Sequence, residues 1–224
     1  MKDPTRIAPL LDLLRDAWEA QPDLALSELW GILENRGIGW GADDEQVAAE
    51  LRALLREHPV AVGEEPVLVR TTAPERLVSI HPGERAVIVR DPDPGRQPTW
   101  WTYGELLRGR VGAPLILGDE EGIPHRLGVI RSIDALARRP RDLGGLSRRS
   151  LGDAAYACRL TGGGLAVIGH AIHLYEKQRR SVSHTRLRWE RIESGAVGEP
   201  LVLRLRGGTE KRELGAVDAL LPLS

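Results

Sequence analysis

The residues of this chain with the clearest potential for chemistry are its arginines, and the chemistry they suit is the binding of anions. Residues 137–191 hold 12 Lys/Arg and 4 Asp/Glu, mostly in the clusters ARRPRDLGGLSRR (137–149) and EKQRRSVSHTRLRWER (176–191). A guanidinium group stays charged at neutral pH, and its N–H donors match the oxygens of a phosphate. The clusters therefore predict a nucleic-acid-binding surface. Its candidate residues are Arg138, Arg139, Arg148, Arg149, Arg179, Arg180, His184, Arg186 and Arg188.

The second arginine cluster alternates in polarity between His184 and Trp189, as a strand does. Alternate residues of a strand share a face, so His184, Arg186 and Arg188 would form one polar face. Such a face is suited to contacts with phosphates. The sequence leaves a second interpretation open, in which these arginines form a solvated face with scattered ion pairs.

The sequence carries no motif typical of a metal site, a phosphate loop or covalent catalysis. His170 and His173 are three residues apart in an expected strand, so their side chains would point to opposite faces. The glycine-rich run 162–169 precedes an expected strand, which leaves no helix N-terminus for a pyrophosphate. We expect no cofactor, no metal and no catalytic residue. An enzyme that uses acids from different loops, such as Asp119 and Glu121, stays an alternative.

The elements that must position these residues are indicated by an internal repeat. The phrase VGAPLILGDEEG (111–122) returns 86 residues later as VGEPLVLRLRGG (197–208), with its first and last glycines, its proline and its leucines in the same places. We predict a duplicated unit at about 77–131 and 165–218. Each copy reads as short alternating strands that are broken by Gly/Pro turns, which predicts a small barrel or a strongly bent sheet.

The two copies differ in the loop that follows the shared strand, which is acidic at 119–121 and basic at 204–206. A constant scaffold with different loops is typical of site-specific recognition. The neighbouring Trp100 and Trp101 would point to opposite faces of a strand, so at most one of them is in the core. We predict contacts with a partner at Trp100, Trp101, Asp119, Glu121, Arg204 and Arg206.

The repeated phrase, which reads Val-Gly, Pro-Leu, an acidic turn and then Leu-Gly-x-Val/Ile, resembles the PRC-barrel. The resemblance covers about 25 residues of each copy. The PRC-barrel is a small interaction domain of RNA-processing and photosynthetic proteins, so the resemblance implies a barrel with a binding function.

The first 74 residues have helical periodicity instead. A first helix, with an apolar stripe at Ile7, Leu10, Leu11, Leu14 and Trp18, would end at Pro22. A second would begin at Ser27, and a third at Asp43 or Asp44 and end before Pro59. Two short apolar runs follow, at 60–62 and 67–70, and the turn between them predicts a β-hairpin.

Three helices followed by a hairpin resemble the winged-helix class, and most of all its HARE-HTH branch. The resemblance implies contact with DNA or protein near RNA polymerase, restriction or chromatin machinery. The third helix argues against reading of a DNA groove, because Asp43, Asp44 and Glu45 in its first turn would repel phosphates. Acids in this position suit caps and the helix dipole. We therefore expect the helical domain to contact protein or to dimerise.

Composition supports two domains with different surfaces. Residues 1–74 hold 7 Lys/Arg and 14 Asp/Glu, whereas residues 75–224 hold 24 and 18. We predict an α+β protein with an acidic winged-helix domain (1–74) and a basic, mainly-β domain (75–224) made of the two barrel-like units. The single cysteine, Cys158, is expected in the core and excludes an intrachain disulfide. The absence of a signal-peptide pattern and of long apolar runs favours a cytoplasmic protein without membrane contact.

These observations predict a non-enzymatic, nucleic-acid-associated regulatory or accessory protein. The basic β domain would bind phosphates, and the helical domain would contact a protein or form a homodimer. The alternative is a protein–protein adaptor, such as an antitoxin, immunity or assembly factor, that does not bind nucleic acid.

Overall fold

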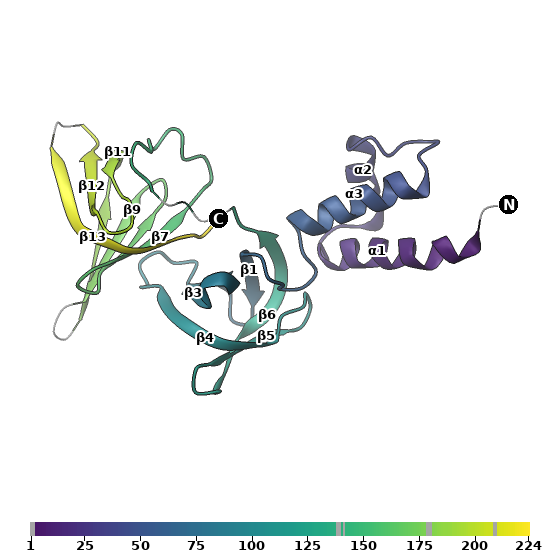
Figure 1. Ribbon diagram of the computed structural model, residues 1–224, viewed down its shortest axis with the longest axis horizontal. Helices are drawn as coiled ribbons and strands as arrows, with labels where there is room; N and C mark the ends of the chain where they lie inside the picture. Colours follow the sequence, from purple (N-terminus) through teal and green to yellow (C-terminus); the bar gives the residue numbers. More distant parts are fainter. Residues whose placement is uncertain (1–2, 138–139, 141, 178–180, 208–209) are drawn as a thin grey trace. The chain divides into compact units, whose positions relative to one another are not determined.

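The computed structural model describes residues 3–137, 140, 142–177, 181–207 and 210–224. The chain divides into two compact units (Figure 1). The first comprises residues 1–89 and 100–135, and the second comprises residues 90–99 and 136–224. Among the described residues the α-helices lie at the start of the first unit and strands form most of the rest of both units, so the α+β class is confirmed.

Three helices, as predicted, open the first unit: α1 (Ile7–Glu19), α2 (Leu26–Asn35) and α3 (Asp44–Glu57). They pack around a small apolar core that includes Leu29, Leu33 and Leu51. Asp43 caps α3 as expected, because its carboxylate accepts a hydrogen bond from the Gln46 amide at 2.8 Å while the Gln46 side chain accepts from the Asp43 amide. The acids at the start of α3 therefore have a structural role.

The segment after α3 differs from the predicted hairpin. Ala61 forms an isolated bridge with Arg110, whereas Val67–Thr72 is strand β1 and pairs with β2 and β6 of a barrel. The side chains of Val67 and Val69 are buried, and a two-stranded wing has too little apolar surface to cover them. The two runs therefore do not pair with each other, and the winged-helix arrangement is not confirmed.

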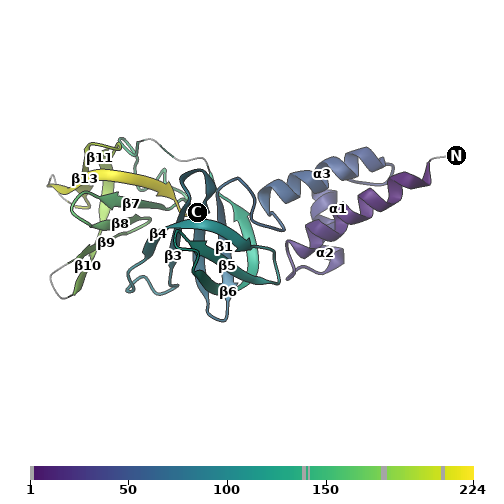
Figure 2. The ribbon, with the colours of Figure 1, turned by 60° about the horizontal axis from the view of Figure 1, so that its bottom comes forward.

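The first unit continues as a closed barrel of six strands in the order β1 to β6 (Figure 2). Inward side chains such as Val78, Ile80, Leu115 and Leu117 fill it. The strands are β1 (Val67–Thr72), β2 (Arg76–His81), β3 (Ala86–Arg90), β4 (Thr99–Arg108), β5 (Pro114–Asp119) and β6 (Pro124–Ala135).

The second unit contains a sheet of seven strands in the order β10-β9-β8-β7-β13-β12-β11. The two end strands, β10 and β11, are separated in the chain by Arg188 alone, so the chain turns a corner there and joins both ends of the sheet. The strands are β7 (Tyr156–Leu160), β8 (Leu165–Ile168), β9 (Ile172–Lys177), β10 (Val182–Leu187), β11 (Trp189–Ser194), β12 (Pro200–Leu205) and β13 (Lys211–Pro222).

The structure contains two similar barrel-like units, one with six strands and one with seven, and the repeated phrase forms corresponding strand pairs in both. Pro114 pairs with Val129 across β5 and β6, and Pro200 pairs with Ala216 across β12 and β13, each pair next to a bulge. The glycines of the repeated phrase also match: the Gly112 amide donates to the Ile130 carbonyl at 2.9 Å, and the Gly198 amide donates to Val217 at 2.8 Å.

Each unit begins one strand earlier than the repeat predicted from the sequence. In the first barrel β1 pairs with β6, and in the second unit β7 pairs with β13 in the same antiparallel sense. The sequences of β1 (VLVRTT) and β7 (YACRL) share only an arginine, which in both strands is exposed and follows two buried residues. The fold that the two units share therefore includes one strand more than the repeated sequence.

A candidate anion-binding cleft in the second unit

A cleft of about 680 Å³ in the second unit is lined by several of its arginines. Five arginines and a single acidic residue line it, together with small residues and the buried Trp189. The arginines are Arg148, Arg149, Arg191, Arg204 and Arg206, and the acid is Glu190. A cleft of this size falls in the range of small-ligand sites in proteins.

Backbone pairing brings these arginines together from three separate segments. Arg191 on β11 is opposite Arg204 on β12. The loop before β7 joins the same edge, since the Arg148 amide donates to the Glu190 carbonyl at 2.9 Å. The Arg206 amide donates to the Arg188 carbonyl at 2.9 Å, which fixes the end of β12 beside the corner between β10 and β11. The pairing register of the strands and of the loop before β7 therefore brings these arginines together.

The cleft carries excess positive charge. Arg204 is paired with Glu193 at 2.6 Å between the guanidinium and the carboxylate. Within the described part of the chain, no carboxylate lies at ion-pairing distance from the other four guanidinium groups. Five arginines beside the single lining acid Glu190 create a positive potential that attracts an anion. The arrangement is therefore suited to bind an anion with several oxygens.

Trp189 forms part of the cleft wall but does not offer its ring to a ligand. Its side chain is 0% exposed, and its indole Nε1 donates to the Gly169 carbonyl at 2.8 Å. Stacking of a base requires an accessible aromatic face. The chemistry available in the cleft is therefore the recognition of charge and of hydrogen-bond acceptors.

The first unit has the opposite charge in the corresponding place. In the first barrel Glu105 pairs with Gly118, in the register that Arg191 and Arg204 have in the second unit. The acidic loop that includes Glu120 corresponds to the segment of Arg206. The contrast between loops 119–121 and 204–206 therefore extends into the neighbouring strand.

The structure gathers some of the predicted binding residues and leaves others apart. Arg148 and Arg149, predicted to bind nucleic acid, share the cleft with Arg204 and Arg206, predicted to contact a partner. The sequence pattern does not single out Arg191, although the repeat aligns it with Glu105 at the same edge. Four further candidates lie outside the described residues: Arg138, Arg139, Arg179 and Arg180.

His184, Arg186 and Arg188 are exposed, which fits the polar face that the alternation predicts, but they do not line the cleft. His184 instead pairs across β9 and β10 with His173, with 2.9 Å between Nε2 of His184 and Nδ1 of His173. The ring of His184 is also stacked on that of Tyr175, with 4.9 Å between centroids. The spacing of the histidines in the sequence does not indicate that His173 contacts His184.

The paired histidines predict a loss of stability in acid. Burial, and then the neighbouring His184 and Arg186, lower the pKa of His173 from its ordinary value of 6.5. The folded unit therefore disfavours a proton that the unfolded chain accepts, so its stability is complete above about pH 6.5 and falls as the pH falls below that value. We expect His173→Asn to reduce the fall between about pH 7 and pH 5 by a few tenths of a kcal/mol. Urea unfolding at a series of pH values measures it, and an unchanged slope would contradict it.

The residues predicted to contact a partner in the first unit include one with a structural role. Asp119 accepts hydrogen bonds from the amides of Glu121 (3.0 Å) and Ile123 (2.8 Å) and pairs with His125 at 2.9 Å. The pairing with His125, followed by the hydrogen bond from the Ile123 amide, lowers the pKa of Asp119. Glu121 is exposed at the tip of the loop. Asp119 therefore shapes the loop that presents Glu121.

The two adjacent tryptophans of β4 are both partly buried. Trp101 packs against the apolar core of the barrel, and its ring centroid is 4.9 Å from that of His125. Trp100 is not among the residues packed against that core. This placement agrees with the expectation that at most one of them belongs to the core.

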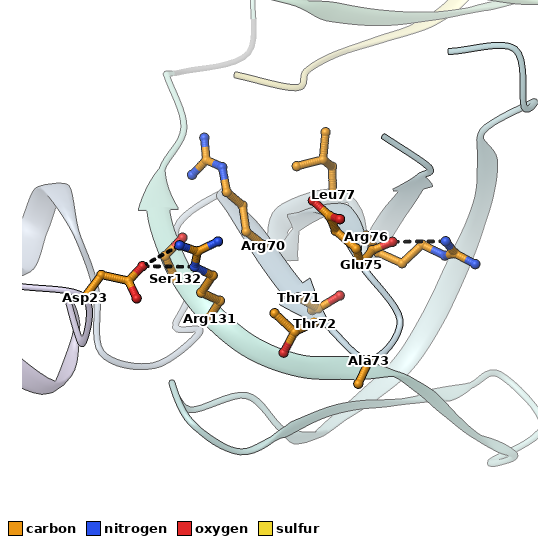
Figure 3. A pocket seen from close by; sticks show the side chains of 10 residues that line it. All are labelled: Asp23, Arg70, Thr71, Thr72, Ala73, Glu75, Arg76, Leu77, Arg131 and Ser132. Atoms are coloured by element: carbon orange, nitrogen blue, oxygen red, sulfur yellow. Dashed lines mark hydrogen bonds and ion pairs between the residues drawn. The ribbon is translucent and has the colours of Figure 1, made fainter. Parts of the chain in front are cut away.

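A second cleft, in the first unit, also contains arginines, but they are engaged by acids or backbone (Figure 3). It measures about 600 Å³ and lies beside β1 and β6. Arg131 is paired with Asp23 at 2.8 Å, and Arg70 is paired with Asp134 on β6. Because these carboxylates already neutralise the arginines, this cleft is less suited to an anion than the cleft of the second unit.

Metal and thiol chemistry find little support in the described residues. Among them, no group of three or more His, Cys, Asp or Glu side chains is placed to hold a metal ion. Cys158 is buried, as predicted, and burial raises the pKa of its thiol to about 12. The thiolate, which is the reactive form of cysteine, is therefore disfavoured at neutral pH.

No family model, curated protein or solved structure matches this chain. Among the described residues, none of the helices has the length and apolar character needed to cross a membrane.

Proposed function

We propose that this chain is a non-enzymatic, nucleic-acid-associated accessory protein that binds phosphates through its second unit. The observation that carries the proposal is the cleft lined by five arginines, four of which have no carboxylate at ion-pairing distance within the described part of the chain. Phosphates of nucleic acids are the abundant cellular anions that such a cluster of guanidinium groups fits. The exposed Arg186 and Arg188 would extend the same basic surface.

A salt titration tests this proposal. Release of counterions makes the logarithm of the binding constant fall with the logarithm of salt concentration, by about 0.9 for each phosphate contact on duplex DNA. Engagement of the four unpaired arginines predicts a slope of about −3 to −4 on duplex DNA and a smaller slope on single strands. Fluorescence anisotropy with labelled DNA and RNA measures both. No binding at about 50 mM salt by protein shown to be folded would refute the proposal.

A second candidate function, protein adaptor, is favoured by apolar side chains exposed on the helical part of the first unit. Six large apolar residues are exposed between positions 7 and 40: Ile7, Leu11, Trp18, Leu26, Trp30 and Trp40. Aromatic residues in an exposed apolar surface are typical of protein contacts. The two functions are compatible, since this surface and the arginine cleft belong to different units.

Five of these side chains come from two consecutive helices, α1 and α2. Ile7, Leu11 and Trp18 follow one another at helical spacing along α1. The Trp18 indole donates to the Leu24 carbonyl at 2.8 Å, which places the end of the α1 stripe beside the start of α2. Leu26 and Trp30 are exposed one turn apart on α2. We name these five residues the apolar stripe.

The charge around the apolar stripe indicates what partner it fits. Residues 1–74 carry twice as many Asp/Glu as Lys/Arg, so a second copy of this segment would be repelled. A basic amphipathic helix would bury the stripe and meet opposite charge at its edges. We therefore propose such a helix, from another protein, as its partner.

Replacing Leu11 and Trp30 by alanine is expected to weaken binding of a Leu/Lys amphipathic peptide on the order of tenfold or more, because exposed anchors dominate such contacts. Titration calorimetry measures the binding, with a Leu/Glu peptide as the control for charge. The matched control variant is Leu107→Ala with Ile123→Ala, which removes exposed apolar residues from the barrel. Equal binding by both variants, or a dimer of the chain that the Leu11 and Trp30 substitutions dissociate, would overturn the choice of partner.

A further inference from the structure

The arginines of the second-unit cleft are concentrated in a cavity and do not form a track. The exposed Arg186 on β10 and Arg188, which follows β10, are absent from its lining. Arg148, Arg191 and Arg206 come from three segments that meet at one edge of the sheet. A continuous nucleic-acid strand is bound by cations spread along its backbone. A cavity with clustered cations is suited to a local concentration of negative charge.

The donor groups of the cleft outnumber the acceptors of one internal phosphodiester. Each guanidinium carries five N–H donors, and four guanidinium groups of the cleft have no carboxylate at ion-pairing distance among the described residues. An internal phosphodiester has one negative charge and two free oxygens. A terminal phosphate has three free oxygens and about −1.5 to −2 charges at pH 7. A terminal phosphate can therefore accept hydrogen bonds from more of the guanidinium N–H donors of the cleft than an internal phosphodiester can.

The lining of the cleft indicates that it recognises the phosphate of a ligand and not the base. Trp189, the aromatic residue in the lining, is fully buried and cannot stack on a base. The rest of the lining is Ser147, Gly207, Glu190 and the arginines. A ligand would therefore be held by its phosphate with little discrimination between bases.

We infer that the cleft of the second unit binds the terminal phosphate of a nucleic-acid strand, and this inference rests on the proposed function. The corresponding place in the first unit carries Glu105 and the acidic loop 119–121, so the described part of that unit offers no equivalent site. The expected stoichiometry is one strand end per chain.

The experiment compares two 12-nucleotide single strands of identical sequence, one with a 5′-phosphate and one with a 5′-hydroxyl. We expect the phosphorylated strand to bind on the order of tenfold more tightly, because the added charge meets unpaired guanidinium groups. Substituting Arg191→Gln and Arg206→Gln should reduce this ratio to about one. The control Arg159→Gln alters an exposed arginine of β7 that is paired with Asp218 and does not line the cleft, and it should keep the ratio.

The outcomes separate this inference from the proposed function. Equal, salt-sensitive binding of both strands would overturn the strand-end site and leave nucleic-acid binding standing. Binding of neither strand by folded protein would overturn both. A free nucleoside monophosphate that binds as tightly as the phosphorylated strand would assign the site to nucleotides and so refute a strand end. Near-ultraviolet circular dichroism of each variant establishes that it is folded.

Discussion

Replacing Arg191 and Arg206 by glutamate is expected to lower the affinity for nucleic acid on the order of 100-fold or more at about 100 mM salt. Each substitution removes a charge-assisted contact and adds a repulsive carboxylate beside the phosphates. The fold should tolerate both changes, because the first unit has Glu105 where the second has Arg191, and an acidic loop where it has Arg206. Anisotropy with labelled strands measures the affinity.

The matched control for this variant is Arg52→Glu with Arg56→Glu, both on exposed positions of α3. It changes net charge by the same amount in the other unit, so a non-specific effect of charge would appear in both variants. We expect the α3 variant to bind within about threefold of the unchanged protein, because exposed charges that do not contact the ligand have small, salt-screened effects. Loss of binding in the α3 variant alone would place the contact on the helices and refute the cleft.

The substitution Gly128→Ala is expected to destabilise the first barrel by about 3 kcal/mol or more. Gly128 has a φ of +107°, which side-chain-bearing residues rarely adopt. A Cβ at this position would lie 2.7 Å from the Pro74 carbonyl oxygen and 2.8 Å from the Thr72 carbonyl oxygen. These are backbone atoms of the adjoining turn and strand, so relieving the clash requires the pairing of β1 with β6 to open.

Gly112→Ala serves as the control for backbone strain without a clash. Gly112 also has a positive φ, +79°, but no atom lies within 4 Å of its added Cβ. We expect a cost of about 1 kcal/mol for this substitution. Hydrogen exchange of the β1 and β6 amides measures the local effect, and equal protection in both variants would show that the close approach at Gly128 contributes nothing.

The sequence by itself determined the local elements and the duplication. Helical spacing and caps such as Asp43 specified the three helices, because they depend on residues within a few positions of one another. The repeated glycines and prolines indicated two equivalent units, since the turns and bulges that they form have the same backbone requirements in both.

Only the tertiary structure decided which segments meet. Val67–Thr72 follows the helices closely and reads as the second strand of a hairpin, yet it closes the first barrel by pairing with β6, about 60 residues later. Pairing of distant strands depends on burying apolar faces together, which local patterns do not encode. Sheet register likewise joined Arg148, Arg191 and Arg206 in one cleft. The sequence indicates which segments are rich in arginine, whereas non-local strand pairing decides which of these arginines line the cleft.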